Sequence, residues 1–234
     1  MLRGGQPVRN SPNTIAASGQ PIYLLGSATN INATGQITGL TTAYNTVYTP
    51  NGVPSGVVLV YCFAQTGLTA GLYYGRWQSS TAINLYSDAA GTVPLSGITS
   101  AAYASATTEA VLAAVTIPAN NMGPNGAIFT MSSTTWTTSA NNKTTRHRFN
   151  ANAGLGTNGT TNTGAPLMSL ITNRGTTGSQ LHMSNNGGFG GAAGQTNALS
   201  VDTTASTTVT LTGQLSNVID SMCLEWYNVQ LYTA

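Results

Sequence analysis

The sequence has very little charge. Seven of its 234 residues are Lys or Arg and five are Asp or Glu, so charged residues make up 5% of the chain, whereas an average soluble domain has about 25%. The few basic residues are scattered, which excludes a strongly basic surface for nucleic acid. Intrinsic disorder is excluded as well, because disordered chains combine low hydrophobicity with high net charge. Here 41% of residues are hydrophobic and the net charge is +2.

Long apolar runs and cysteines are also scarce. No run of eighteen apolar residues that could span a membrane is present. The first residues, MLRGGQPVRNSPNT, have no apolar stretch behind them, so we expect no secretory signal. Cys62 and Cys223 are the only cysteines, and each lies in an apolar run. We expect two buried free thiols, as in a chain made in a reducing cytoplasm; a disulfide between them is the alternative.

The residue groups that catalysis requires are missing too. The five acidic residues are far apart in the sequence, and only a carboxylate pair formed across strands could give a glycosidase site. We instead expect Asp88 and Asp220 in turns and Glu225 facing water. His147 and His182 lack neighbours at metal-ligand spacing, and no G-x-S-x-G sequence occurs. We therefore predict a protein that is not an enzyme and has no cofactor and no metal.

Ser, Thr, Asn, Gln and Gly take the place of charge. Short apolar runs alternate with clusters of these turn-forming residues, a pattern typical of all-β proteins. The glycine run at 187–194 lacks the strand, helix and acidic residue of a dinucleotide loop. Predicted strands are Ile22–Leu25, Val57–Phe63, Leu72–Trp77, Ile83–Tyr86, Ala127–Thr134, Thr144–Phe149, Met168–Asn173, Gln180–Met183, Thr207–Gly213 and Met222–Leu231.

Two segments need a more specific prediction. Only Thr108–Val115, TEAVLAAV, could be helical, and Pro118 limits its length. The last strand, MCLEWYNVQL, begins with apolar residues on one face and continues with them on the other. A bulge near Trp226–Tyr227 would place both sets in the core. We accordingly expect Trp226 in the core, like Trp77 and Trp136.

Composition divides the chain into three parts. Residues 1–19 have no apolar periodicity and are predicted to form an extended N-terminal arm, followed by an N-terminal β domain (20–107) and a C-terminal β domain (108–234). A segment like the arm becomes ordered only by docking, at a cost of about 1–2 kcal/mol per residue. The residues of the arm that we expect to bind a partner are Leu2, Arg3, Val8, Arg9 and Ile15.

Two further groups could contact a partner. Tyr73 and Tyr74 are adjacent in a predicted strand, so one faces outward, where it could anchor an interface or stack on a sugar. Lys143, Arg146 and Arg148, with His147, form the only basic cluster. It is either a small anion contact or the solvated face of one strand, TTRHRF, and we favour the solvated face.

Several sequence elements match a known module in order. From Val115 onward these are TIPANNMGPNGAIF, WTTSANNKTTRHRF, LITNRGTTGSQ, NGGFG and VDTTASTTVTLTGQLSNVIDSMCLEWYNVQL. Together they resemble a C-terminal jelly-roll module of tailed-bacteriophage structural proteins. GQITGLTTAYNTVYTP and AGLYYGRWQSSTAINLYSDAAG resemble its N-terminal partner module.

The resemblance implies two antiparallel β-sandwich or jelly-roll modules in a virion structural protein, made in the bacterial cytoplasm. Proteins of this family are commonly homotrimers, and a nearly neutral surface favours such association. We expect a capsid decoration (cement) protein that stabilises the head and binds the major capsid protein, or tail or portal proteins, through the arm. The alternative is a tail-fibre or receptor-binding protein that recognises a host surface glycan. Neither role involves nucleic acid or a membrane.

Overall fold

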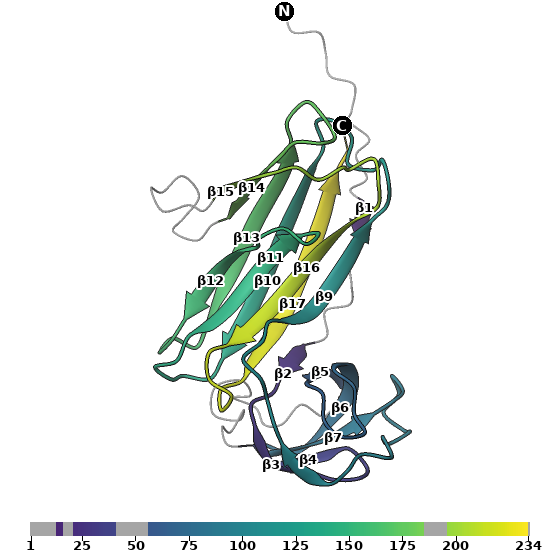
Figure 1. Ribbon diagram of the computed structural model, residues 1–234, viewed down its shortest axis with the longest axis vertical. Helices are drawn as coiled ribbons and strands as arrows, with labels where there is room; N and C mark the ends of the chain where they lie inside the picture. Colours follow the sequence, from purple (N-terminus) through teal and green to yellow (C-terminus); the bar gives the residue numbers. More distant parts are fainter. Residues whose placement is uncertain (1–12, 16–20, 41–55, 185–195, 234) are drawn as a thin grey trace, which may run out of the picture.

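The computed structural model describes residues 13–15, 21–40, 56–184 and 196–233 (Figure 1). These residues form seventeen strands and no helix, which confirms the prediction of an all-β protein. The strands are β1 (Asn13–Ile15), β2 (Ile22–Leu24), β3 (Ala28–Ile31), β4 (Gln36–Leu40), β5 (Val58–Cys62), β6 (Gly71–Ser79), β7 (Ala82–Tyr86), β8 (Ala101–Tyr103), β9 (Ala110–Ile117), β10 (Ala127–Trp136), β11 (Lys143–Phe149), β12 (Leu155–Gly159), β13 (Gly164–Asn173), β14 (Gln180–Ser184), β15 (Thr196–Leu199), β16 (Thr207–Leu215) and β17 (Met222–Tyr232).

All ten predicted strands are confirmed, but the predicted helix is wrong. The AVLAAV part of this segment, residues 110–115, belongs to β9, an edge strand that pairs with β16 along its length. Val115 and Ile117 point into the core while Val111 is 46% exposed. Ala, Leu and Glu favour a helix in isolation. Here the apolar residues gain more by completing a buried sheet face, and tertiary packing decides the conformation.

The strands form two sheets. A thirteen-strand sheet has the order β15-β14-β13-β10-β17-β2-β5-β6-β7-β4-β3-β8, with β1 also paired to β17. A four-strand sheet has the order β12-β11-β16-β9 and lies across from β10, β13 and β17 (Figure 1). Neighbouring strands are antiparallel except for β2 and β5. The large sheet therefore runs without a break from one end of the described structure to the other.

Two apolar cores lie on this frame. The larger core fills the space between the two sheets and includes Trp136, Phe149 and Met222. The second core consists of residues between Tyr23 and Tyr103, together with Cys223. Strand β2 serves both, because Ile22 and Leu24 belong to the first core and Tyr23 to the second. Side chains alternate across a strand, so one short strand joins the two cores.

The last strand contains the predicted bulge, one residue earlier than expected. Ser133 of β10 pairs with Trp226 and Thr134 pairs with Leu224, so Glu225 is the extra residue. Tyr227 is buried as predicted, but Trp226 is 43% exposed, and the prediction that it lies in the core is wrong. Because the bulge comes before Trp226 rather than after it, this side chain takes the outward position.

Candidate interaction surfaces

The outer face of the large sheet over β10, β13, β14 and β17 is apolar. Several of the residues that alternate with the buried ones along these strands are large and hydrophobic, and they are only partly covered or exposed. We call this surface the Met-rich face. It comprises Phe129, Met131, Met168, Leu170, Leu181, Met183, Trp226 and Tyr232.

Strand register brings these side chains into contiguous rows. Phe129 pairs with Leu170, which pairs with Met183, and Met131 pairs with Met168. Directly opposed residues on one sheet face contact each other, so the rows form one surface. Trp226 and Tyr232 on β17 are each 43% exposed. The four-strand sheet covers the other side of these strands, where Ser132 and Ser169 contact β11.

A charged residue, Glu225, lies beside this face. The Glu225 carboxylate at the bulge accepts a hydrogen bond of 2.5 Å from the Thr135 hydroxyl. The remaining outward positions of β10 and β17 near it are Ser, Asn and Gln, namely Ser133, Asn228 and Gln230. A surface of this composition resembles the centre of a protein interface, where Met and aromatic residues are enriched and charge is depleted.

The adjacent tyrosines face opposite sides of the N-terminal part of the sheet. Tyr73 packs on the second core, and its hydroxyl donates a hydrogen bond of 2.8 Å to the Thr69 carbonyl. Tyr74 lies on the outer face, paired with Leu59 on one side and Tyr86 on the other. Tyr74 is therefore the residue that faces outward, and its contact with a partner stays a prediction.

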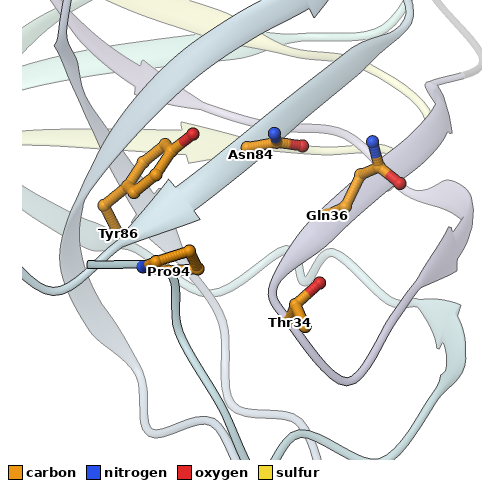
Figure 2. A pocket seen from close by; sticks show the side chains of 5 residues that line it. All are labelled: Thr34, Gln36, Asn84, Tyr86 and Pro94. Atoms are coloured by element: carbon orange, nitrogen blue, oxygen red, sulfur yellow. The ribbon is translucent and has the colours of Figure 1, made fainter. Parts of the chain in front are cut away.

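Next to Tyr74 lies a shallow pocket of about 230 Å³ (Figure 2). Figure 2 shows Gln36 and Asn84 side by side, with Tyr86 next to Asn84; the other lining residues are Thr34 and Pro94. The Asn84 side-chain carbonyl is buried and has no hydrogen-bond partner among the residues that the structure describes. The lining is thus neutral and combines an aromatic ring with amide groups.

The basic cluster is split between two faces of β11, which corrects the expectation of one solvated face. Arg146 and Arg148 lie on the outer side with Glu109, and Arg148 Nη2 is 2.5 Å from the Glu109 carboxylate. These arginines lower the pKa of Glu109. Lys143 and His147 point inward and are fully buried. The cluster therefore does not offer a basic surface.

The buried Lys143 holds together the loops at one end of the two-sheet region. Its ammonium donates hydrogen bonds to the Ser139 hydroxyl (2.6 Å) and to the carbonyls of Asn141 (2.9 Å) and Thr160 (3.2 Å). Asp220 lies 4.0 Å away and only partly offsets the desolvation that lowers the pKa of Lys143. Asp220 is in a turn, as predicted, but it is buried rather than solvated.

Buried polar side chains, two histidines among them, also lie between the sheets. His147 bridges the sheets, with Nε2 2.8 Å from the Ser132 hydroxyl and Nδ1 2.9 Å from the Ser169 hydroxyl. His182 on β14 is fully buried, and neither ring nitrogen has a partner in the described part of the chain. Burial lowers the pKa of His147 to about 3 and that of His182 to about 4. Both rings are therefore neutral at pH 7, and sequence spacing alone did not reveal this arrangement.

Both cysteines are free and buried, as predicted. Cys223 pairs with Tyr23, which pairs with Val60, two residues before Cys62. The Cα atoms of Cys62 and Cys223 are therefore two strand spacings apart across the sheet and two residues apart along it, a distance of about 12 Å. A disulfide requires less than about 7 Å, so these thiols cannot form one without a change of fold.

The predicted arm is described only at Asn13–Ile15. These residues form β1, which pairs with the C-terminal part of β17, and Ile15 lies opposite Val229 of the same chain. The other predicted contact residues, Leu2, Arg3, Val8 and Arg9, lie outside the described residues, as does the glycine run at 187–194. The role of the arm in binding a partner stays a prediction, but the backbone of Ile15 is already paired within the chain.

Compared with known proteins, the chain matches no protein-family model and no curated protein. In the described ranges no three His, Cys, Asp or Glu residues gather as metal ligands. The same ranges contain no helix long and apolar enough to cross a membrane.

Proposed function

We propose that this chain is a structural protein of a tailed-bacteriophage virion, a trimeric decoration protein that stabilises the head. The observation that carries the proposal is the arrangement of Ala110–Tyr232. The segments that resemble the phage module contribute to β10, β11, β13, β16 and β17, and strands β9 to β17 form two antiparallel sheets over one core. Residues 20–107 with the second core are then the N-terminal domain of the pair.

The path of the chain supports a jelly-roll-like module. In a jelly roll the chain passes repeatedly between two antiparallel sheets. Here it changes sheet at β9–β10, β10–β11, β12–β13, β15–β16 and β16–β17. A decoration protein needs a stable shape rather than a reactive site. The two packed sheets and the scarcity of charge suit that task.

Truncation of the predicted arm tests this proposal. Capsids that lack the protein are incubated with full-length protein or with variants truncated before residue 13 or before residue 19. Because β1 pairs with β17, the shorter truncation retains the described fold. We expect it to stay folded and trimeric but to lose capsid binding. Full capsid occupancy by the variant that lacks residues 1–12 would refute the arm as the anchor.

A second candidate function, recognition of a host surface glycan by a fibre protein, is supported by the pocket beside Tyr74. Sugars bind to aromatic rings and to amide and hydroxyl groups, which Tyr86, Gln36 and Asn84 offer together. Its volume is below the range of about 300–1,000 Å³ typical of pockets for drug-sized molecules, so it suits a single sugar ring. Binding of host polysaccharide fragments that is lost in Asn84→Ala, but kept in the exposed control Ser100→Ala, would support this function.

A further inference from the structure

We infer that the Met-rich face is the surface through which three copies of this chain associate. The inference rests on the proposed homotrimer and identifies which of its faces is buried. Three of the six methionines of the chain, Met131, Met168 and Met183, lie on this one face. Methionine adapts its shape to a partner surface and is favoured where apolar surfaces meet.

The size of the face matches that of an interface. Four strands spaced about 4.8 Å apart and about ten residues rising about 3.3 Å each give roughly 19 by 33 Å, or about 600 Å². That approaches the roughly 800 Å² that each partner contributes to a standard protein interface. The area includes polar positions such as Ser133, Asn228 and Gln230, and its apolar part is comparable with the largest apolar patches of monomeric proteins, which commonly serve a function.

The occupant that fits this face is another copy of the chain. A different protein is usually recognised through complementary charge, and the Met-rich face offers none for it to complement. The Glu225 carboxylate beside the face already accepts a hydrogen bond from Thr135. Identical uncharged surfaces can meet without like-charge repulsion, and interfaces between copies are more apolar than other interfaces.

Threefold packing is consistent with the dimensions of the sheet. Three flat faces about 19 Å wide, arranged as a triangular prism, each lie about 5.5 Å from the axis. Facing sheets pack about 10 Å apart, so one layer of side chains extends about 5 Å from each sheet. The pairs at the middle of the face, Phe129 with Leu170 and Met131 with Met168, lie on β10 and β13 and would therefore reach the axis.

The first test is the mass of a charge variant. The double variant Met131→Glu, Leu170→Glu places charge on two outward positions and leaves both cores intact. The control is Thr116→Glu, at an exposed position of β9 on the other sheet. By sedimentation equilibrium we expect wild type and control at three times the 24.0 kDa monomer mass, and the double variant as a folded monomer.

The outcomes separate the two claims. A monomeric wild type would refute the homotrimer of the proposed function and this inference with it. A trimeric wild type and a trimeric double variant would refute only the choice of face.

A milder variant covers the case in which the double variant does not fold. Met131→Cys introduces a thiol on the face, while Cys62 and Cys223 are buried and react slowly. We expect maleimide to label position 131 at least tenfold more slowly in the trimer than the exposed control Thr116→Cys. Equal labelling rates at the two positions would overturn the inference.

Discussion

The two buried histidines predict a marked loss of stability in mild acid. Burial disfavours the charged ring and, with a smaller contribution from the nearby His182, lowers the pKa of His147 from 6.5 to about 3. The pKa of His182 falls from 6.5 to about 4 by burial alone. The groups near His147 on the packed strands are the Ser132 and Ser169 hydroxyls and His182, and no carboxylate from the described ranges bonds to it.

The direction follows from proton linkage. The unfolded chain binds protons near pH 6.5, whereas the folded chain does so only near pH 3–4, so acid favours unfolding. The contribution of the two neutral histidines to the free energy of unfolding is fully present above about pH 7.5, and it falls as the pH drops below 6.5. A pH of 5 is about 1.5 units below the pKa of an unfolded histidine, so each ring lowers the free energy of unfolding by about 2 kcal/mol. Together the two rings lower it by about 4 kcal/mol, which is a large part of the free energy of unfolding of a typical protein, about 5–15 kcal/mol.

The assay is guanidinium unfolding at pH 8 and pH 5, followed by tryptophan fluorescence at one protein concentration. The chain has only two histidines, and unfolded carboxyl groups titrate near pH 4, so this window isolates the two rings. In His182→Leu we expect about half of the pH dependence, since His147 alone remains. A wild type whose free energy of unfolding differs by less than about 1 kcal/mol between the two pH values would refute the reasoning.

Three further predictions concern stability. Alkylation of the denatured, unreduced protein should label both Cys62 and Cys223, and a mass two hydrogens lower with no label would contradict the free thiols. Lys143→Met should lower the free energy of unfolding by about 3–5 kcal/mol, because its buried acceptors lose their donor; an unchanged denaturation midpoint would contradict this. Gly67→Ala should destabilise more than Gly175→Ala: both have positive φ, but only at Gly67 would the new methyl group collide with a backbone carbonyl. Equal destabilisation by the two substitutions would show that the positive φ alone, and not the collision, sets the cost.

The fold was largely predictable because apolar alternation and turn residues mark most strands. The strands that were missed, such as β3 (ATNI) and β12 (LGTNG), are short and rich in Thr, Asn and Gly, so they carry no apolar signal. Strand β9 was misread because local helix propensity conflicts with the sheet that tertiary packing imposes. Pairing between distant segments is not visible in local sequence.

The interaction surfaces were harder to predict than the strands. In KTTRHRF, Lys143, His147 and Phe149 alternate with the arginines, and this pattern could have indicated that they share the buried face. The Met-rich face had a signal as well, because β10 and β13 carry apolar residues on both faces, as in Phe129 beside Ile128. A strand that is apolar on both sides needs a cover on both. The fold supplies one cover, and a second copy is our proposal for the other.

The most direct test of the account is the number of copies in purified particles of the phage that encodes this chain. Quantitative mass spectrometry against the major capsid protein gives that number, and gold-labelled antibody gives the position. The account predicts hundreds of copies, in multiples of three, spread over the head. A handful of copies at the tail would contradict decoration and favour the fibre, and particles without the chain would contradict a virion protein altogether.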